Sequence, residues 1–222
     1  MMGEKLVEIS GVHFSYNSSP LLTDINLCIC EGDFVGVVGA NGSGKTTLVK
    51  LLLGHLTPQK GTVRHYRDGK PVAAPQIGYL PQYAAVDKSF PLSVREVVET
   101  GLLTPRSMWN PFLLSADRRR VDAILSQMGL SSLASKPIGS LSGGELQKAI
   151  LARAIVSSPR LLLLDEPDTY LDSCSQESLY EFLKDINRNC AILLVSHDVS
   201  AVSAKCNLVA TVNHTLQVHR NI

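Results

Sequence analysis

The chain has 222 residues, 45% of them hydrophobic, and its 21 basic and 20 acidic residues leave a formal net charge of +1. This balance argues against a basic nucleic-acid-binding surface and against a polybasic membrane anchor, so we expect no nucleic acid among the partners. The N-terminal segment MMGEKLVEIS has no apolar signal region, and no apolar run approaches the ~20 residues of a membrane helix. We therefore expect a cytoplasmic chain that is long enough to bury a substantial core.

The N-terminal third of the chain has the alternating pattern of β-strands. Residues 5–16 and 21–39 are rich in β-forming residues, with the sequence EGD as a turn, and predict an antiparallel β-layer. From Gly42 the apolar spacing becomes helical, and it ends near Gly54. Residues 57–82 are expected to form turns and short strands.

Residues 85–155 have helical patterns, including a Ser cap followed three residues later by Glu in SVREVVETGLL. RLLLLDEP and CAILLVSHD are continuous apolar runs of strand length, which predict a parallel sheet covered by helices on both faces. We expect one domain spanning 1–222, with the helical subdomain 85–155 inserted between the core segments 1–84 and 156–222.

The cysteines and histidines do not form a recognisable framework. The five cysteines match no disulfide spacing, and Cys28 and Cys30 are expected to be free thiols on one face of a strand, buried as free cysteines usually are. His214 and His219 could belong to a metal sensor, but a strand with surface imidazoles is the simpler interpretation.

The segment VGVVGANGSGKTT is the most specific motif in the sequence. It matches G-x-x-x-x-G-K-[ST] and lies between an apolar strand and a helix, where glycines let backbone N–H groups converge on phosphates and the helix dipole adds positive potential. Lys45 is expected to reach the β- and γ-phosphates and Thr46 to ligate Mg²⁺. The alternative is a plain glycine-rich turn. The expected phosphate-binding residues are Gly39, Asn41, Gly42, Ser43, Gly44, Lys45, Thr46 and Thr47.

An acidic pair ends the apolar run LLLLDEP. Asp165 lies at the carboxyl end of a predicted parallel strand, where ligands of such sheets collect, and is expected to hold Mg²⁺ directly or through water. Glu166 points in another direction and could polarise the water that attacks the γ-phosphate. An acidic pair that merely ends a strand in solvent is the alternative.

Taken in order, the motifs of this chain resemble those of the ATP-binding subunits of ABC transporters over essentially its whole length. GANGSGKTT resembles the Walker A loop, GYLPQ the Q-loop, LSGGE the signature motif, LLLLDEP Walker B, DTYLD the D-loop and VSHD the switch histidine segment. The resemblance implies an α/β P-loop NTPase (RecA-like) core with a mostly parallel sheet, an N-terminal antiparallel β-layer and an inserted helical subdomain. It also implies ATP hydrolysis coupled to transmembrane transport, with ATP and Mg²⁺ as cofactors.

The same resemblance assigns roles to single residues. Glu166, His197 and Gln82 form the implied catalytic set, and Thr46, Gln82 and Asp165 the implied Mg²⁺ ligands. Tyr16 would stack on adenine and Asp172 would carry signals between subunits. Tyr16 could instead be an ordinary strand aromatic, His197 a strand-end histidine and Gln82 part of a turn.

The segment LSGGELQK contains a capping box, with Ser142 as N-cap and Glu145 at the third helical position. A capping box does not explain Gly143 and Gly144, because glycines destabilise a helix and are useful where something approaches the backbone closely. The resemblance implies that the group that approaches this backbone is the γ-phosphate of ATP bound to a second copy of the chain. A homodimer with ATP at its interface is then expected.

The sequence departs from the usual family pattern at three positions. Glu145 replaces the commoner glutamine, and Lys148 stands where arginine is usual, which removes the planar two-pronged donor. Tyr170 is bulky where a small residue is common in the D-loop. Because Glu166 and His197 are retained, a working ATPase is expected.

No membrane span accompanies the single ATPase unit, which favours an importer whose permease is a separate chain. YAAVDKSFPLSVREVVETGL and LASKPIGSLSGGE resemble the ATPases of zinc, manganese and iron importers. The implied partners are an integral-membrane permease and an extracytoplasmic solute-binding protein, which would place the chain on the inner face of the membrane. Alternatives are siderophore, haem or cobalamin importers, an export-related or non-transport ABC ATPase, and a scaffold that binds ATP without turnover. The segment SMWNPFLL, with Trp109, Phe112, Leu113 and Leu114, either lines the permease-docking groove or packs into the core.

Overall fold

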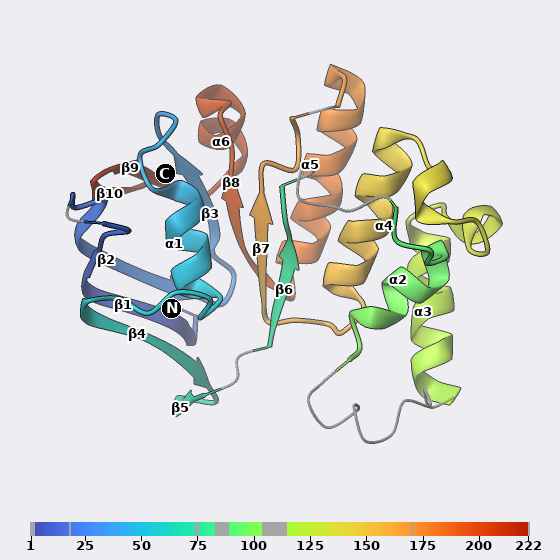
Figure 1. The fold of residues 1–222 in the computed structure, drawn as a ribbon, viewed down its shortest axis with the longest axis horizontal. Coiled ribbons are helices and arrows are strands. Elements are labelled where there is room, and N and C mark those ends of the chain that lie inside the picture. Colours follow the sequence, from blue (N-terminus) through green and yellow to red (C-terminus); the bar gives the residue numbers. More distant parts are fainter. Residues whose placement is uncertain are drawn as a thin grey trace. The chain divides into compact units, whose positions relative to one another are not determined.

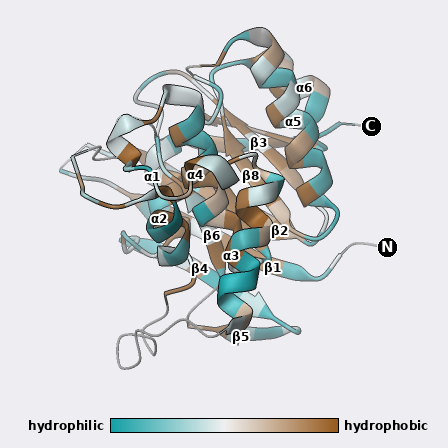
Figure 2. Cartoon of the chain, turned by 90° about the vertical axis from the view of Figure 1, so that its right-hand side faces the viewer, coloured by the Kyte–Doolittle hydropathy of each residue, from teal (hydrophilic) through white to brown (hydrophobic). Residues whose placement is uncertain are grey.

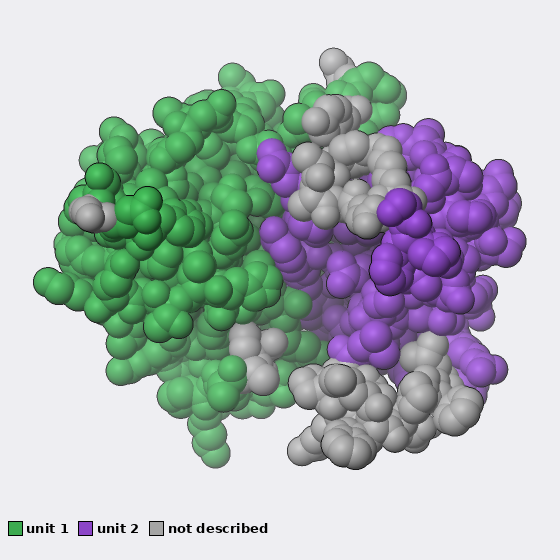
Figure 3. Space-filling model, in the orientation of Figure 1, with its two compact units in different colours: residues 1–77, 160–222 green, residues 78–159 purple. Residues whose placement is uncertain are grey.

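The structure is a computed structural model that describes residues 3–17, 19–73, 76–82, 89–103, 115–169 and 171–221. The chain divides into two compact units (Figure 3). The first unit contains residues 1–77 and 160–222, and the second contains residues 78–159. Trp109, Phe112, Leu113, Leu114 and Tyr170 lie outside the described residues.

The first unit begins with an antiparallel sheet in the order β2-β1-β4-β5, which confirms the predicted β-layer for residues 5–14 and 22–30 (Figure 1). Residues 34–38 were expected in the same layer but belong to the second sheet, because their continuous apolar run is buried on both faces. Alternate residues are buried from Ile25 to Ile29 of β2, so this strand presents one face to the core and one to solvent, whereas in β1 register shifts interrupt the alternation. The strands are β1 (Lys5–Phe14), β2 (Leu22–Cys30), β4 (Lys60–Arg67) and β5 (Lys70–Val72).

A second sheet forms the core of the first unit, where its strands follow the order β10-β9-β3-β8-β7. Every residue of β3, β7 and β8 is buried, and Figure 2 shows β3 and β8 in the hydrophobic colour. These strands run parallel to one another and to β9, as their apolar runs predict. The strands are β3 (Phe34–Val38), β7 (Leu161–Asp165), β8 (Ala191–Val195), β9 (Leu208–Asn213) and β10 (Thr215–Arg220).

The register of the parallel strands decides which segments meet. Val195 pairs with Val37 on one side and with Asp165 on the other. The carboxyl ends of β3, β7 and β8 are therefore level, and the segments that follow them emerge at one edge of the sheet. Those segments are the glycine-rich loop, the acidic pair and the histidine segment.

Three helices belong to the first unit: α1 (Lys45–Leu52), α5 (Ser173–Asn187) and α6 (Val199–Lys205). Helix α1 contacts β7, α5 contacts β8 and α6 contacts β3. Helix α6 starts at Asp198, whose carboxylate accepts the backbone N–H of Ala201 at 2.9 Å and so satisfies one free donor of the first turn.

Gly36 in the middle of β3 has no room for a side chain. A methyl group there would come 2.1 Å from Cγ1 of Val202 and 3.0 Å from Sγ of Cys206. We expect Gly36→Ala to lower the free energy of unfolding by about 1–3 kcal/mol, because a close-packed interior absorbs an added carbon only through strain. Denaturant titration of both proteins measures the difference.

The matched control removes Cγ1 of Val202, the nearest atom that the new methyl group of Gly36→Ala would meet. In Gly36→Ala/Val202→Ala the second substitution makes space, so the combined loss should be smaller than the sum of the two single losses. A double variant whose loss equals that sum would contradict the steric explanation.

The described part of the second unit is mainly helical and contains α2 (Val94–Thr100), α3 (Ser115–Gln127) and α4 (Gly143–Ile155). In α3, Val121 and Leu125 are buried on the predicted apolar face, and the basic run 118–120 is exposed. The helical pattern is interrupted before α4, because Gly129 has a left-handed φ of 67° that ends α3. Two short 3₁₀ turns follow, η3 (Ser131–Leu133) and η4 (Ile138–Ser140).

No helix among the described residues is long and apolar enough to cross a membrane.

Candidate functional site

The loop between β3 and α1 has a backbone that only glycine adopts easily. Gly39, Gly42 and Gly44 have φ values of 156°, 78° and 107°. A Cβ on Gly39 would lie 2.3 Å from the carbonyl oxygen of Val212, and one on Gly44 would lie 2.5 Å from a methyl group of Leu22. All three glycines are therefore favoured by backbone conformation, and Gly39 and Gly44 are also required by close packing.

The N-terminus of α1 is open to an anion. Gly44 occupies the N-cap position, and no side chain in the described part of the chain caps the helix. The first-turn N–H groups of a helix attract negative charge when no side chain satisfies them.

Lys45 lies across this loop. Its Nζ donates to the carbonyl oxygens of Gly39 at 2.9 Å and Ala40 at 3.0 Å, and the side chain is buried. These two bonds hold the ammonium group of Lys45 against the phosphate loop, where it can interact with bound phosphates.

Asp165, the last residue of β7, carries a carboxylate that lacks a full set of partners. It is 1% exposed, and its Oδ1 finds no hydrogen-bond partner among the described residues. Burial and the neighbouring Glu166 carboxylate raise the pKa of Asp165, while a hydrogen bond with Thr46 and the charge of Lys45 act in the opposite direction. A buried carboxylate oxygen next to a hydroxyl is costly alone but fits a divalent cation, so these residues suit Mg²⁺.

Glu166 and His197 form a pair at the same edge of the sheet. The Nε2 atom of His197 lies 2.5 Å from Oε1 of Glu166. The backbone N–H of Glu166 donates to the carbonyl oxygen of Val195 at 3.0 Å, and Glu166 has a left-handed φ of 53°. This strained conformation turns the chain directly after Asp165, so the two acidic side chains can serve different roles.

Tyr16 lies beside the phosphate loop. Its hydroxyl is 3.3 Å from Oγ1 of Thr47 in α1, and its ring packs edge-on against Phe14 with centroids 5.0 Å apart. Tyr16 is 56% exposed, so a planar ligand can reach its side chain.

Two other candidates lie elsewhere. Asp172 is the N-cap of α5, where its carboxylate accepts the backbone N–H of Ser175 at 2.8 Å, and this bond lowers the pKa of Asp172. Gln82 follows β6 (Ile77–Leu80), the strand in which the chain passes from the first unit to the second, and is exposed.

Ser142 and Glu145 form the predicted capping box at the start of α4. The Glu145 carboxylate accepts the Ser142 backbone N–H at 2.8 Å and its hydroxyl at 2.7 Å, and these bonds lower the pKa of Glu145. Helix α2 starts with the same arrangement, at Ser93 and Glu96, but without glycines. A Cβ on Gly144 would meet nothing within 4 Å. Packing among the described residues therefore gives no reason for glycine at this position.

A buried polar cluster behind the Glu166–His197 pair was missed by the sequence analysis. The Asp168 carboxylate accepts the hydroxyls of Tyr180 at 3.0 Å and Ser196 at 2.9 Å. The signal in the sequence is the second aspartate of DEPD, but its partners lie 12 and 28 positions away and their proximity depends on the tertiary fold.

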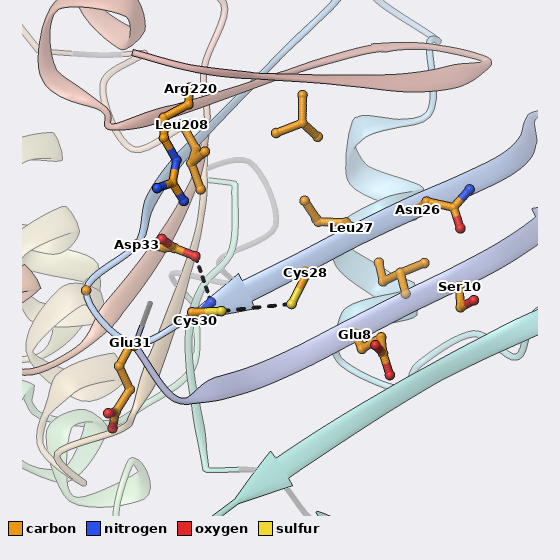
Figure 4. Close-up of a pocket in the computed structure, with 14 residues that line it drawn as sticks. Glu8, Ser10, Asn26, Leu27, Cys28, Cys30, Glu31, Asp33, Leu208 and Arg220 are labelled. Atoms are coloured by element: carbon orange, nitrogen blue, oxygen red, sulfur yellow. Dashed lines mark hydrogen bonds between the residues drawn. The ribbon is translucent and has the colours of Figure 1, made fainter. Parts of the chain in front are cut away.

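The expectation that Cys28 and Cys30 are buried is wrong. Both thiols lie on one face of β2 with 3.9 Å between their sulfurs, but Cys28 is exposed and Cys30 only half-buried. The reason is that this face of β2 lines a surface pocket of about 830 Å³, together with Asp33 and Arg220 (Figure 4). Desolvation and the neighbouring Cys28 raise the pKa of Cys30 to about 11.

The metal-sensor interpretation of the C-terminal histidines has no support in the described part of the chain, where no group of three or more His, Cys, Asp or Glu side chains is arranged to hold a metal ion. His219 lies on β10 and is exposed. His214 is not on a strand, because it occupies the left-handed turn between β9 and β10 with a φ of 57°.

A buried parallel sheet with a G-x-x-x-x-G-K-T loop at the carboxyl end of a core strand defines a P-loop NTPase. The sequence profile of the ABC transporter family matches residues 22–169. The chain therefore belongs to the ABC transporter family, whose ATP-binding domain it contains.

Relatives with curated names agree with this assignment. The chain is 37% identical to the high-affinity zinc uptake system ATP-binding protein ZnuC of Bacillus subtilis, over 89% of this chain and 86% of that protein. It is 34% identical to the zinc uptake system ATP-binding protein ZurA of Listeria monocytogenes, over 95% and 83%. Among solved structures, cbiO1 of Clostridium perfringens, part of the ABC transporter complex cbiONQ, is 26% identical with a TM-score of 0.82 and coverage of 98% and 89%.

Proposed function

We propose that this chain is the ATP-hydrolysing subunit that energises a membrane importer of a metal ion, with zinc, manganese and iron as the candidate cargoes. The names of the zinc-uptake relatives support the class of cargo. The observation that carries the ATPase assignment is the level register of β3, β7 and β8, which brings the phosphate loop, Asp165 and the Glu166–His197 pair to one edge of the sheet.

The hydrolytic chemistry follows from the positions of these side chains. The loop glycines and Lys45 would bind and orient the phosphates, and Tyr16 would stack on the adenine. Glu166 would accept a proton from the attacking water, while His197 hydrogen-bonds the γ-phosphate and keeps the Glu166 carboxylate oriented. Gln82 is the third member of the proposed catalytic set.

Thr46, Asp165 and Gln82 are the proposed Mg²⁺ ligands, which the unpaired Oδ1 of Asp165 supports. When bound, Mg²⁺ would neutralise part of the negative charge of the phosphates. This chain contributes the Thr46 hydroxyl near the start of α1 and the Asp165 carboxylate at the end of β7, which are joined by a hydrogen bond.

The proposed assembly is a homodimer that binds ATP at its interface, with Ser142, Gly143 and Gly144 of one copy facing the γ-phosphate on the other. The open space at Gly144 supports this role, since no contact with another described residue requires glycine there. Asp172 would lie near the same interface. The dimer would dock on an integral-membrane permease on the cytoplasmic side, in a system with an extracytoplasmic solute-binding protein.

The nucleotide site is tested by Lys45→Ala, with Lys50→Ala in the same helix as control. We expect Lys45→Ala to weaken ATP binding and to reduce kcat/KM for hydrolysis by about 10²-fold or more, since the phosphates lose a buried cation. Lys50 is exposed, so its removal should leave both quantities near those of the wild type. Equal activity in the two variants would contradict the assigned site.

The cargo is tested by deleting the gene and measuring uptake of radioactive zinc, manganese and iron. Loss of uptake of one ion, restored by the wild-type gene and not by Lys45→Ala, is the expected result. Unchanged uptake of all three ions, with loss of siderophore, haem or cobalamin uptake, would support the alternative importer class. No transport defect of any kind would favour a non-transport ABC ATPase.

A further inference from the structure

Asp168 lies in the first unit behind the Glu166–His197 pair, and its carboxylate is almost fully buried. Its Oδ2 accepts the Tyr180 hydroxyl at 3.0 Å and the Ser196 hydroxyl at 2.9 Å. The exposed fractions of Asp168, Tyr180 and Ser196 are 7%, 4% and 0%. We call these three residues the Asp168 clamp.

The clamp joins the two segments that carry the catalytic pair. Asp168 follows Glu166 by two residues after β7, and Ser196 directly precedes His197 after β8. The Ser196 hydroxyl also accepts the backbone N–H of Asp198 at 3.0 Å, so both neighbours of His197 are held. A single carboxylate thus fixes the distance between the chain segments on which Glu166 and His197 stand.

Helix α5 supplies the third member and a further contact. Tyr180 reaches the carboxylate from the middle of α5, and Gln176, one turn earlier, donates to the backbone carbonyl of Asp168 at 3.2 Å. The burial of this tyrosine and the negative charge of Asp168 raise the pKa of Tyr180, so its hydroxyl stays protonated as a donor. Helix α5 therefore holds the Asp168 segment by both side chain and backbone.

If the Asp168 clamp had a purely structural role, apolar residues at these three positions would serve equally well. Burying a carboxylate costs free energy that two neutral hydroxyl donors offset only in part, and well-packed hydrophobic groups of similar volume are usually at least as stable. What a satisfied polar network provides instead is one fixed arrangement of its members. Fixed geometry matters most next to reacting groups, where a misplacement of about 1 Å can cost 10²-fold in rate.

We propose that the Asp168 clamp is a positioning device for ATP hydrolysis, which sets the orientation of His197 against Glu166 and connects it to α5. The proposal rests on the function proposed above. Asp168, Tyr180 and Ser196 are positioning residues, because they act through the catalytic pair.

Tyr180→Phe is the test, since it removes one hydroxyl and leaves the ring in place. We expect kcat for ATP hydrolysis to fall about 10-fold while KM for ATP stays within about two-fold, because nucleotide contacts are unchanged and the catalytic pair is less well fixed. The ring ¹⁵N signals of His197, assigned by their absence in His197→Ala, should shift in the same variant.

Tyr66→Phe is the matched control. Tyr66 donates to the Glu8 carboxylate at 2.8 Å, which is the same bond in the antiparallel sheet of the same unit. This variant loses an equivalent hydrogen bond, but its kcat and its His197 signals should equal those of the wild type.

The proposal stands only if Tyr180→Phe both lowers kcat and shifts the His197 signals while Tyr66→Phe does neither. A Tyr180→Phe protein with wild-type kcat or unshifted His197 signals would overturn it, as would equal effects of the two variants. If the wild-type chain hydrolyses no ATP, the proposed function fails. The spectra then still report whether the clamp orients His197.

Discussion

Glu166→Gln is expected to reduce ATP hydrolysis by about 10²–10⁴-fold, the usual contribution of a general base. The amide keeps the size of the side chain and can still hydrogen-bond His197, but it cannot accept a proton from water. Nucleotide binding should persist, because the phosphate loop and Lys45 are untouched. ATP-bound dimers should therefore accumulate, and size-exclusion chromatography with ATP and Mg²⁺ measures them alongside a phosphate-release assay.

Glu177→Gln is the control for this substitution. Glu177 is an exposed residue of α5 that pairs with Lys205 at the surface, with 2.5 Å between Oε1 and Nζ. Its replacement removes the same charge from the same unit but leaves the catalytic edge unchanged. Hydrolysis by Glu166→Gln at the wild-type rate would remove Glu166 from the role of base. A scaffold that binds ATP without turnover would show no hydrolysis in either the wild type or the variant.

Ser142→Arg is expected to abolish ATP hydrolysis while nucleotide binding by each monomer remains largely intact. The arginine would fill the space in front of Gly143 and Gly144, where the γ-phosphate of the second copy is proposed to lie. The reason for separable effects is that Ser142 belongs to the second unit, whereas the phosphate loop belongs to the first. Hydrolysis, ATP affinity and ATP-dependent dimerisation are the three measurements.

Ser93→Arg provides a control that loses the same helix cap. The Ser93 capping box matches that of Ser142, with the backbone N–H donating to Glu96 at 2.8 Å and the hydroxyl at 2.6 Å. Both variants should lose similar stability from the missing cap, about 0.5–2 kcal/mol. Only Ser142→Arg should prevent dimerisation and turnover, and full activity in that variant would rule out the role across the interface.

The local motifs of this chain could be predicted because they encode their own geometry. The glycines of the phosphate loop have the positive φ angles that the motif requires, and the Ser142–Glu145 capping box forms as its spacing predicts. The apolar runs that end at Asp165 and Val195 became buried parallel strands, since a strand without polar alternation must be covered on both faces.

Two expectations about side chains were wrong for reasons that no local pattern contains. Residues 28 and 30 were correctly expected on one face of a strand. However, this face borders a surface pocket instead of the core, and β10, nearly two hundred residues later, contributes Arg220 to that pocket. His214 was expected on a strand but occupies the left-handed turn that joins β9 to β10. Periodicity gives the side of a strand on which residues 28 and 30 lie, but it does not give what covers that side, and for His214 it did not show where one strand ends and the next begins.

The sequence by itself determined the parts of the site that are contiguous: the phosphate loop, the acidic pair after β7 and the start of α4. The tertiary structure decided what depends on register and packing. The pairing of Val195 with Val37 and Asp165 levels three strand ends, and only then does His197 reach Glu166. The bonds from Tyr180 and Ser196 to Asp168 have the same origin, because residues that are distant in the chain meet only when the strands between them are aligned.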